Sequence, residues 1–161
     1  MPGLRRLRRR RSAPRLAPPP RPSRPRPAAY YRVAGIALDR ELDRLRALPV
    51  FADGPLAAAR PGLKVRRARR RPNRVGFAVP AEFRLSVTAY PGIRAGDALE
   101  TLLHELVHLH VGRAAEAHAW HGRTFQATLA RAMREAYGVA PPPGRATLHG
   151  AYAEAIERRR G

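Results

Sequence analysis

Leucines at helical spacing mark the first ordered element that the sequence predicts. They recur every three or four residues and the run ends at a proline: Leu38, Leu42, Leu45, Leu48 and Pro49. Apolar residues at this spacing lie on one face of a helix. The pattern therefore predicts a short amphipathic helix over residues 36–48.

Three short extended segments follow this helix. Residues 63–70 and 75–79 are separated by Pro72-Asn73, a turn signal that predicts a hairpin between them. In residues 83–88, apolar positions alternate with Arg84, Ser86 and Thr88. A two-residue period is typical of a strand with one buried face.

Two longer helices are predicted in the second half of the chain. Asp97, followed three residues later by Glu100, resembles a capping box in which a carboxylate replaces Ser or Thr. A helix should therefore run over residues 98–111, and Gly112 stands where a left-handed C-terminal cap is expected. Residues 123–137 predict a second helix that ends at Gly138, with an apolar stripe of Phe125, Leu129, Ala132, Met133 and Ala136.

Together these elements predict one α+β domain. Its sheet would be short, antiparallel or mixed, with about three strands packed on the helix of residues 98–111 and on the helix after it. We divide the chain into a disordered Arg/Pro-rich basic tail (1–29), a folded domain (30–140), and a linker with a short basic C-terminal helix (141–161). The folded part is long enough for one modest core.

The chain contains no cysteine, which excludes disulfides, thiolate metal ligands and cysteine nucleophiles. Only His, Asp and Glu remain as protein ligands for a transition metal. No apolar run approaches the roughly 18 residues of a membrane span, and no secretory signal is recognisable. We therefore expect a cytoplasmic monomer that does not enter a membrane.

The net charge of +20 is concentrated in two segments. Residues 1–29 hold ten Arg and no acidic residue, and residues 60–74 hold seven Arg and one Lys, again with no acidic residue. Such a field attracts nucleic acid, so association with the nucleoid is a further expectation. Candidate contacts are Arg66, Arg67, Arg69, Arg70, Arg71 and Arg74. An alternative explanation of this charge is a GC-rich coding sequence, because 31 of the 32 basic residues are Arg. The tail is equally consistent with a wrongly assigned start codon.

Residues 104–108 read His-Glu-Leu-Val-His, a pattern typical of zinc peptidases. Residues four apart on a helix lie about 40° apart around its axis, so His104 and His108 can present both imidazoles to one metal ion. Glu105 lies about 60° from His108, close enough to accept a proton from a water that the metal activates. The motif predicts one zinc per chain, with Glu105 as general base.

A catalytic zinc usually has a third protein ligand. Glu116, His118 and His121 follow the motif, whereas His110 is about 240° from His104 around the helix and points elsewhere. We favour His121, because Gly122 after it allows close backbone approach and Phe125 can anchor the next helix. His118 and Glu116 remain alternatives. Tyr90, Arg113 and Tyr137 are open candidates for stabilising the oxyanion.

The stretch from Glu100 to His108, followed by His121-Gly122-Arg123-Thr124-Phe125, resembles the SprT-like zinc metallopeptidases, relatives of the Spartan DNA-protein crosslink proteases. The resemblance covers roughly residues 36–138. It implies a zincin-like fold in which His104, His108 and His121 bind zinc, Glu105 is catalytic, and the strand Arg84-Leu85-Ser86-Val87 borders the cleft. Many SprT-like proteins carry a cysteine-rich zinc ribbon, which this chain lacks, so DNA targeting would fall to its basic segments.

The sequence therefore predicts a zinc metalloendopeptidase that hydrolyses peptide bonds through a zinc-activated water, with DNA-associated proteins among its substrates. Two alternatives remain. One is a basic nucleic-acid-binding protein whose metal site is not catalytic. The other is a zinc hydrolase of a non-peptide substrate, since an activated water also attacks other electrophiles.

Overall fold

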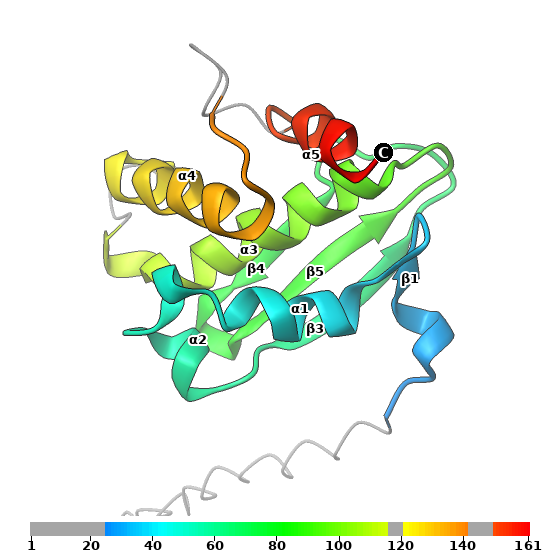
Figure 1. Cartoon of the computed structure of the whole chain (residues 1–161). Coiled ribbons are helices and arrows are strands. Elements are labelled where there is room, and N and C mark those ends of the chain that lie inside the picture. Colours follow the sequence, from blue (N-terminus) through cyan, green and yellow to red (C-terminus); the bar gives the residue numbers. More distant parts are fainter. Residues whose placement is uncertain (1–24, 116–120, 142–149) are drawn as a thin grey trace, which may run out of the picture.

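A computed structural model describes residues 25–115, 121–141 and 150–161 of the chain, so most of the predicted tail lies outside it. The described residues form an α+β fold (Figure 1). The strands are β1 (Arg32–Val33), β2 (Ile36–Ala37), β3 (Gly62–Arg67), β4 (Gly76–Val79) and β5 (Arg84–Ala89). The α-helices are α1 (Leu38–Arg46), α2 (Pro55–Ala58), α3 (Ala95–Ala115), α4 (Arg123–Tyr137) and α5 (Ala153–Arg160), with 3-10 turns at Ala28–Tyr31, Pro49–Phe51 and Pro80–Glu82. Among these residues, no helix is long and apolar enough to cross a membrane.

The main sheet has β5 at its centre, parallel to β3 on one side and antiparallel to β4 on the other. The predicted hairpin of β3 with β4 is therefore wrong. Five of the six β5 residues are buried, including Ser86 and Thr88, so the expected single buried face is also wrong. The strand that is buried on both faces takes the centre, whereas β3 exposes Lys64, Arg66 and Arg67, side chains suited to an edge.

Helix α3 is the central helix of the molecule. It contacts β4 and β5 as well as all four other α-helices (Figure 1). Leu102, Leu103, Leu106 and Val107 on consecutive turns are fully buried. A helix that is apolar around most of its circumference is typical of burial between layers, and this burial fixes the positions of the residues between those side chains.

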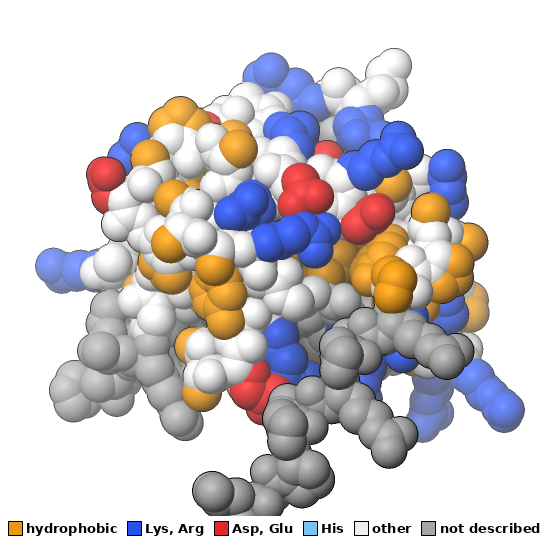
Figure 2. Space-filling model, turned by 90° about the horizontal axis from the view of Figure 1, so that it is seen from below, with side chains coloured by type: hydrophobic (Ala, Val, Ile, Leu, Met, Phe, Trp, Pro, Cys, Tyr) orange, Lys and Arg blue, Asp and Glu red, His pale blue; other side chains and the backbone are white. Residues whose placement is uncertain are grey.

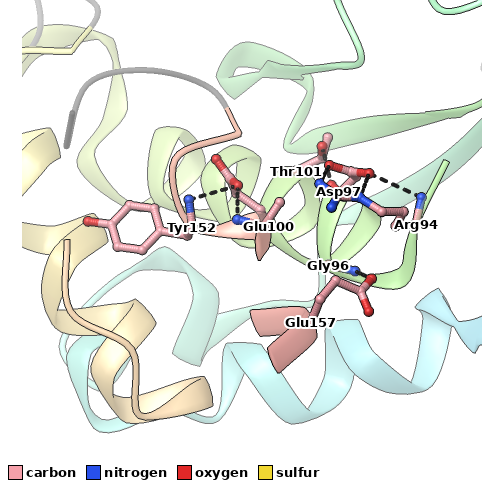
Figure 3. Close-up of polar contacts among 8 residues, drawn as sticks. Arg94, Gly96, Asp97, Glu100, Thr101, Tyr152 and Glu157 are labelled. Atoms are coloured by element: carbon pink, nitrogen blue, oxygen red, sulfur yellow. Dashed lines mark hydrogen bonds and ion pairs between the residues drawn. The ribbon is translucent and has the colours of Figure 1, made fainter. Parts of the chain in front are cut away.

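The start of α3 differs from the predicted capping box. Helix α3 begins at Ala95, and the Asp97 carboxylate accepts a hydrogen bond from the Arg94 backbone N–H, at 3.1 Å. Asp97 is therefore the third residue of the helix, the N3 position of a capping box, and not the N-cap residue that the sequence predicted. Glu100 reaches the C-terminal segment instead (Figure 3).

Glycines end or interrupt the helices near their predicted positions. At Gly112 the backbone leaves helical geometry, with φ 72° and ψ 171°, before the last turn of α3. Helix α4 has the predicted bounds and ends at Gly138 in a left-handed conformation. Its predicted stripe is buried at Phe125, Leu129, Ala132 and Met133. The helix predicted over residues 36–48 is also confirmed in its main part, as α1.

Hydrogen bonds join α5 and the residues just before it to the first turns of α3. The Glu100 carboxylate accepts hydrogen bonds from the backbone N–H groups of Gly150, Tyr152 and Ala153, at 2.6, 3.1 and 2.6 Å. Gly96 donates its N–H to Glu157 (Figure 3), and any Cβ at Gly96 would collide with the Ala153 carbonyl. Tyr152 and Ile156 belong to the common core, so this helix is part of the same packed unit.

Candidate metal centre

Three histidines converge on one point beside the sheet. His104 and His108 lie one turn apart on α3, and His121 lies two residues before α4. Their Nε2 atoms form a nearly equilateral triangle, with distances of 3.1 Å (His104 to His121), 3.2 Å (His104 to His108) and 3.3 Å (His108 to His121). Within the described ranges this is the one cluster of His, Asp and Glu that could hold a metal ion.

The triangle fits a tetrahedral metal ion. Nitrogen ligands bind zinc at about 2.0–2.1 Å, which places two of them about 3.3 Å apart in tetrahedral geometry. The three Nε2 distances lie close to that value. The residues present can therefore supply three ligands to one ion, and imidazole nitrogens suit zinc as well as other first-row transition metals.

Phe125 at the start of α4 packs against all three imidazoles. Its ring centroid is 4.9 Å from that of His104, 4.4 Å from that of His108 and 4.8 Å from that of His121. The Gln126 side-chain amide donates to the His121 carbonyl, at 2.8 Å. Two consecutive residues of α4 thus contact the ring and the backbone of His121, the candidate ligand that lies outside α3.

Burial favours the neutral form of two of these imidazoles, His108 and His121. Burial lowers the pKa of His108 to about 4, with His121 adding to the shift, and burial also lowers the pKa of His121. Only a neutral imidazole has a lone pair for a metal. At neutral pH the site therefore presents ligands in the form that a metal requires.

Glu105 lies on α3 next to the first histidine and is 5% exposed. Burial raises the pKa of its carboxyl to about 8, and the positive charge of Arg74 opposes that rise. A Cβ atom at Gly76 of β4 would lie 2.8 Å from Oε1 of Glu105 and 2.5 Å from Cγ2 of Thr101. Gly76 therefore allows β4 to pass directly against the carboxylate.

A pocket of about 580 Å³ opens on the triad. One wall carries His104, Glu105, His108 and His121, and the other is the segment of residues 71–78. The strand that borders the cleft is thus β4 and not the segment Arg84-Leu85-Ser86-Val87. The latter lies at the centre of the sheet, so β4 separates it from the pocket.

Along β4, alternate residues direct their backbone groups away from β5. The Thr88 N–H donates to the Val75 carbonyl, at 2.7 Å, which makes these two residues a hydrogen-bonded pair. Hydrogen-bonded pairs alternate with non-bonded pairs along an antiparallel ladder. The N–H and C=O groups of Gly76 and Ala78 therefore point away from β5, toward the open edge.

The remaining candidates lie elsewhere. His110 packs against Phe51 with ring centroids 5.1 Å apart, as its position on the helix predicted. The Tyr137 hydroxyl donates to Glu41, and Tyr90 does not line the pocket. Glu116 and His118 lie outside the described residues, as does the side chain of Arg113.

The basic residues of the segment 66–74 differ in their surroundings. Arg66, Arg69, Arg70 and Arg71 are all exposed. Of these, Arg66 lies over the ring of Phe77 and Arg71 over that of Tyr90. On the face seen in Figure 2, basic side chains are spread among acidic ones rather than gathered in one patch. The contacts of these arginines with nucleic acid stay a prediction.

Comparison with models of protein families, with curated proteins and with solved structures found no match for this chain. The interpretation of the site therefore depends on its own geometry.

Proposed function

We propose that this protein is a zinc-dependent metallopeptidase of the SprT-like type, with a zincin-like active site. The observation that carries the proposal is a buried carboxylate, Glu105, beside three converging imidazoles in one open pocket. His104, His108 and His121 would hold the ion. When bound, zinc would lower the pKa of a water molecule in the pocket and polarise the substrate carbonyl.

Glu105 supplies the proton transfer. Its ionised form would be favoured by a zinc ion beside it, against the effect of burial. The carboxylate then accepts a proton from the attacking water and returns it to the leaving amine, which is general base and then general acid catalysis. A purely structural zinc site has four protein ligands, whereas the described residues offer three around an open pocket. That arrangement favours an enzyme over a protein with a non-catalytic metal site.

The open edge of β4 favours a peptide substrate. The outward N–H and C=O groups of Gly76 and Ala78 can pair with an extended chain, as sheet edges do when they bind peptides. Such pairing would hold a peptide bond near Glu105, because Gly76 abuts that carboxylate. A hydrolase of a small non-peptide substrate has no need of a free strand edge.

Metal reconstitution tests the proposal. We expect the purified chain to cleave unfolded protein or peptide substrates, to lose this activity when a chelator removes the metal, and to regain it with about one zinc per chain. DNA-bound proteins are the preferred test substrates, because the arginine-rich segment that adjoins the cleft can contact the DNA phosphates beside them. Zinc binding with no cleavage of any peptide would favour a non-catalytic or non-peptide function.

A further inference from the structure

Two arginines, Arg71 and Arg74, line the pocket on the wall opposite the histidines. Among the lining residues, Glu105 is the single acidic side chain, and the proposed function assigns it to proton transfer. The wall formed by residues 71–78 therefore presents two positive charges to a pocket with a single acidic residue.

The two arginines are not equivalent. The Arg71 guanidinium lies 6.0 Å from the centroid of the Tyr90 ring, which gives it a partner inside the fold. Arg74 is exposed, and within the part of the chain that the structure describes it has no hydrogen bond, ion pair or ring contact. Its charge nonetheless reaches Glu105, whose raised pKa it opposes.

The position of Arg74 relative to β4 defines where it would meet a substrate. Arg74 precedes Gly76 by two residues, at the amino end of the open edge. Antiparallel pairing is more stable per residue than parallel pairing, and a peptide that pairs antiparallel with β4 runs from Val79 toward Gly76. The residues that follow its paired segment, on the carboxyl side of the bond next to Glu105, then lie beside Arg74.

We infer that Arg74 is a specificity-determining residue that binds a carboxylate of the peptide substrate, on the carboxyl side of the cleaved bond. This inference rests on the proposed peptidase function. The carboxylate can come from an Asp or Glu side chain or from the terminal carboxyl group of the peptide. A guanidinium forms two parallel hydrogen bonds with either group.

A peptide carboxylate is favoured over a nucleic-acid phosphate because of where the guanidinium lies. Arg74 lines the pocket that contains Glu105 and the histidines, where a cleaved peptide must pass. Arg69 and Arg70 are also exposed but line no part of that pocket. They can contact a polyanion outside the cleft, so Arg70 provides a matched control.

The test measures binding before catalysis. Peptides of one sequence would carry Glu or Gln at the second position after the cleaved bond, each with a free or an amidated carboxyl terminus. Their affinities would be measured with full-length Glu105→Gln protein, alone and combined with Arg74→Gln, Arg74→Lys or Arg70→Gln. We expect a preference of about 1.5- to 5-fold for the acidic form of one pair, as for an exposed ion pair.

That preference should disappear in Arg74→Gln and persist in Arg74→Lys and Arg70→Gln. The Glu/Gln pair reports a side-chain carboxylate, and the free/amidated pair reports a terminal one. An equal preference with and without Arg74 would overturn the inference, as would DNA affinity that falls as much in Arg74→Gln as in Arg70→Gln. If the wild type cleaves peptides without a charge preference, the inference about Arg74 fails and the peptidase proposal stands. If acidic peptides bind preferentially but no peptide is cleaved, the peptidase proposal fails and the binding role of Arg74 stands.

Discussion

The ring of His121 reaches the other two histidines from outside their helix. Its position depends on Phe125, which contacts all three imidazoles, and on Gln126, which holds its carbonyl. His110 has a different environment although it lies on the same helix as His104 and His108, because it packs against Phe51. A comparison of His121 with His110 therefore contrasts a candidate metal ligand with a packing residue.

Replacement of His121 by Ala should lower zinc affinity by more than about 100-fold, since even outer contacts of a metal ligand contribute 10- to 100-fold. Replacement of His110 by Ala should leave the affinity nearly unchanged. Competition with a chromophoric chelator measures both values. Full zinc occupancy in His121→Ala, with loss in His118→Ala or Glu116→Ala, would show that another residue is the third ligand.

The three metal-binding candidates were predictable because two of them depend on helix geometry alone. The i, i+4 spacing of His104 and His108 places both rings on one side of α3 wherever that helix lies. The choice of His121 needed the further cue of Gly122 and Phe125. Gly76 and Arg74 could not be assigned to the site in this way, because their approach to Glu105 depends on which strand occupies the open edge.

At the scale of elements, the start of α4 couples the core to the metal site. Phe125 and Leu129 lie one turn apart on its buried face, with 2% and 3% exposure. The Phe125 ring also packs against the imidazoles. Both side chains should support stability, but one of them should also support the arrangement of the ligands.

We therefore expect Phe125→Ala and Leu129→Ala to destabilise the fold by similar amounts, about 2–5 kcal/mol. Zinc affinity of the folded protein should fall at least several-fold in Phe125→Ala and much less in Leu129→Ala. Denaturant unfolding and zinc titration give the two quantities separately. Equal zinc affinities in the two variants would remove the positioning role of Phe125.

The contact of α3 with α5 depends on an ionisable group. Burial raises the pKa of Glu100 to about 7, although three backbone N–H donors favour its charged form. The folded state then binds more protons than the unfolded state between about pH 4.5 and 7. Stability from this group is therefore fully present at low pH and is lost as the pH rises through that window.

Comparing the pH dependence of stability of the wild type with that of Glu100→Gln isolates this effect, because the two proteins have all other titrating groups in common. Between pH 5 and pH 8 the wild type should lose about 1–3 kcal/mol of unfolding free energy relative to the variant. Denaturant unfolding at the two pH values measures the difference. A wild type that gains stability relative to Glu100→Gln over this range would mean that the N–H donors outweigh burial.

Local sequence patterns predicted the helices and strands themselves better than the contacts between them. Helices α1 and α4 follow from apolar spacing and from a proline or glycine at the end, which are local signals. The order of the strands is not local, because β5 pairs with two segments on either side of the Pro72-Asn73 turn. Glu100 was predicted to take part in a capping box of its own helix, because its actual hydrogen-bond partners lie about 50 residues later in the chain and cannot be read from the local sequence.

At the scale of the whole molecule, the net positive charge predicts binding to a polyanion such as DNA. Arg69 and Arg70 are exposed at the loop that leads from β3 to the cleft. If they contact phosphates, DNA affinity should fall steeply with salt and should depend little on base sequence. Recruitment of this kind would concentrate the proposed peptidase near DNA-bound proteins.

Replacing Arg69 and Arg70 by Gln should reduce the slope of log affinity against log salt by about 2, because each lost phosphate contact contributes roughly 0.9. Replacing Arg158 and Arg160 by Gln removes the same charge from α5 and should change the slope less. Fluorescence anisotropy with one DNA duplex across a salt series measures these slopes. A flat salt response of the wild type would contradict the predicted DNA contact.

The most direct test of a zinc peptidase here is hydrolysis by Glu105→Gln at full zinc occupancy. Gln keeps the size of the side chain but cannot accept the proton, so zinc should remain at about one per chain while peptide hydrolysis falls by about 100-fold or more. Glu82→Gln, which alters an exposed carboxylate next to β5, should retain both. Undiminished hydrolysis by zinc-loaded Glu105→Gln would contradict the proposed role of this site.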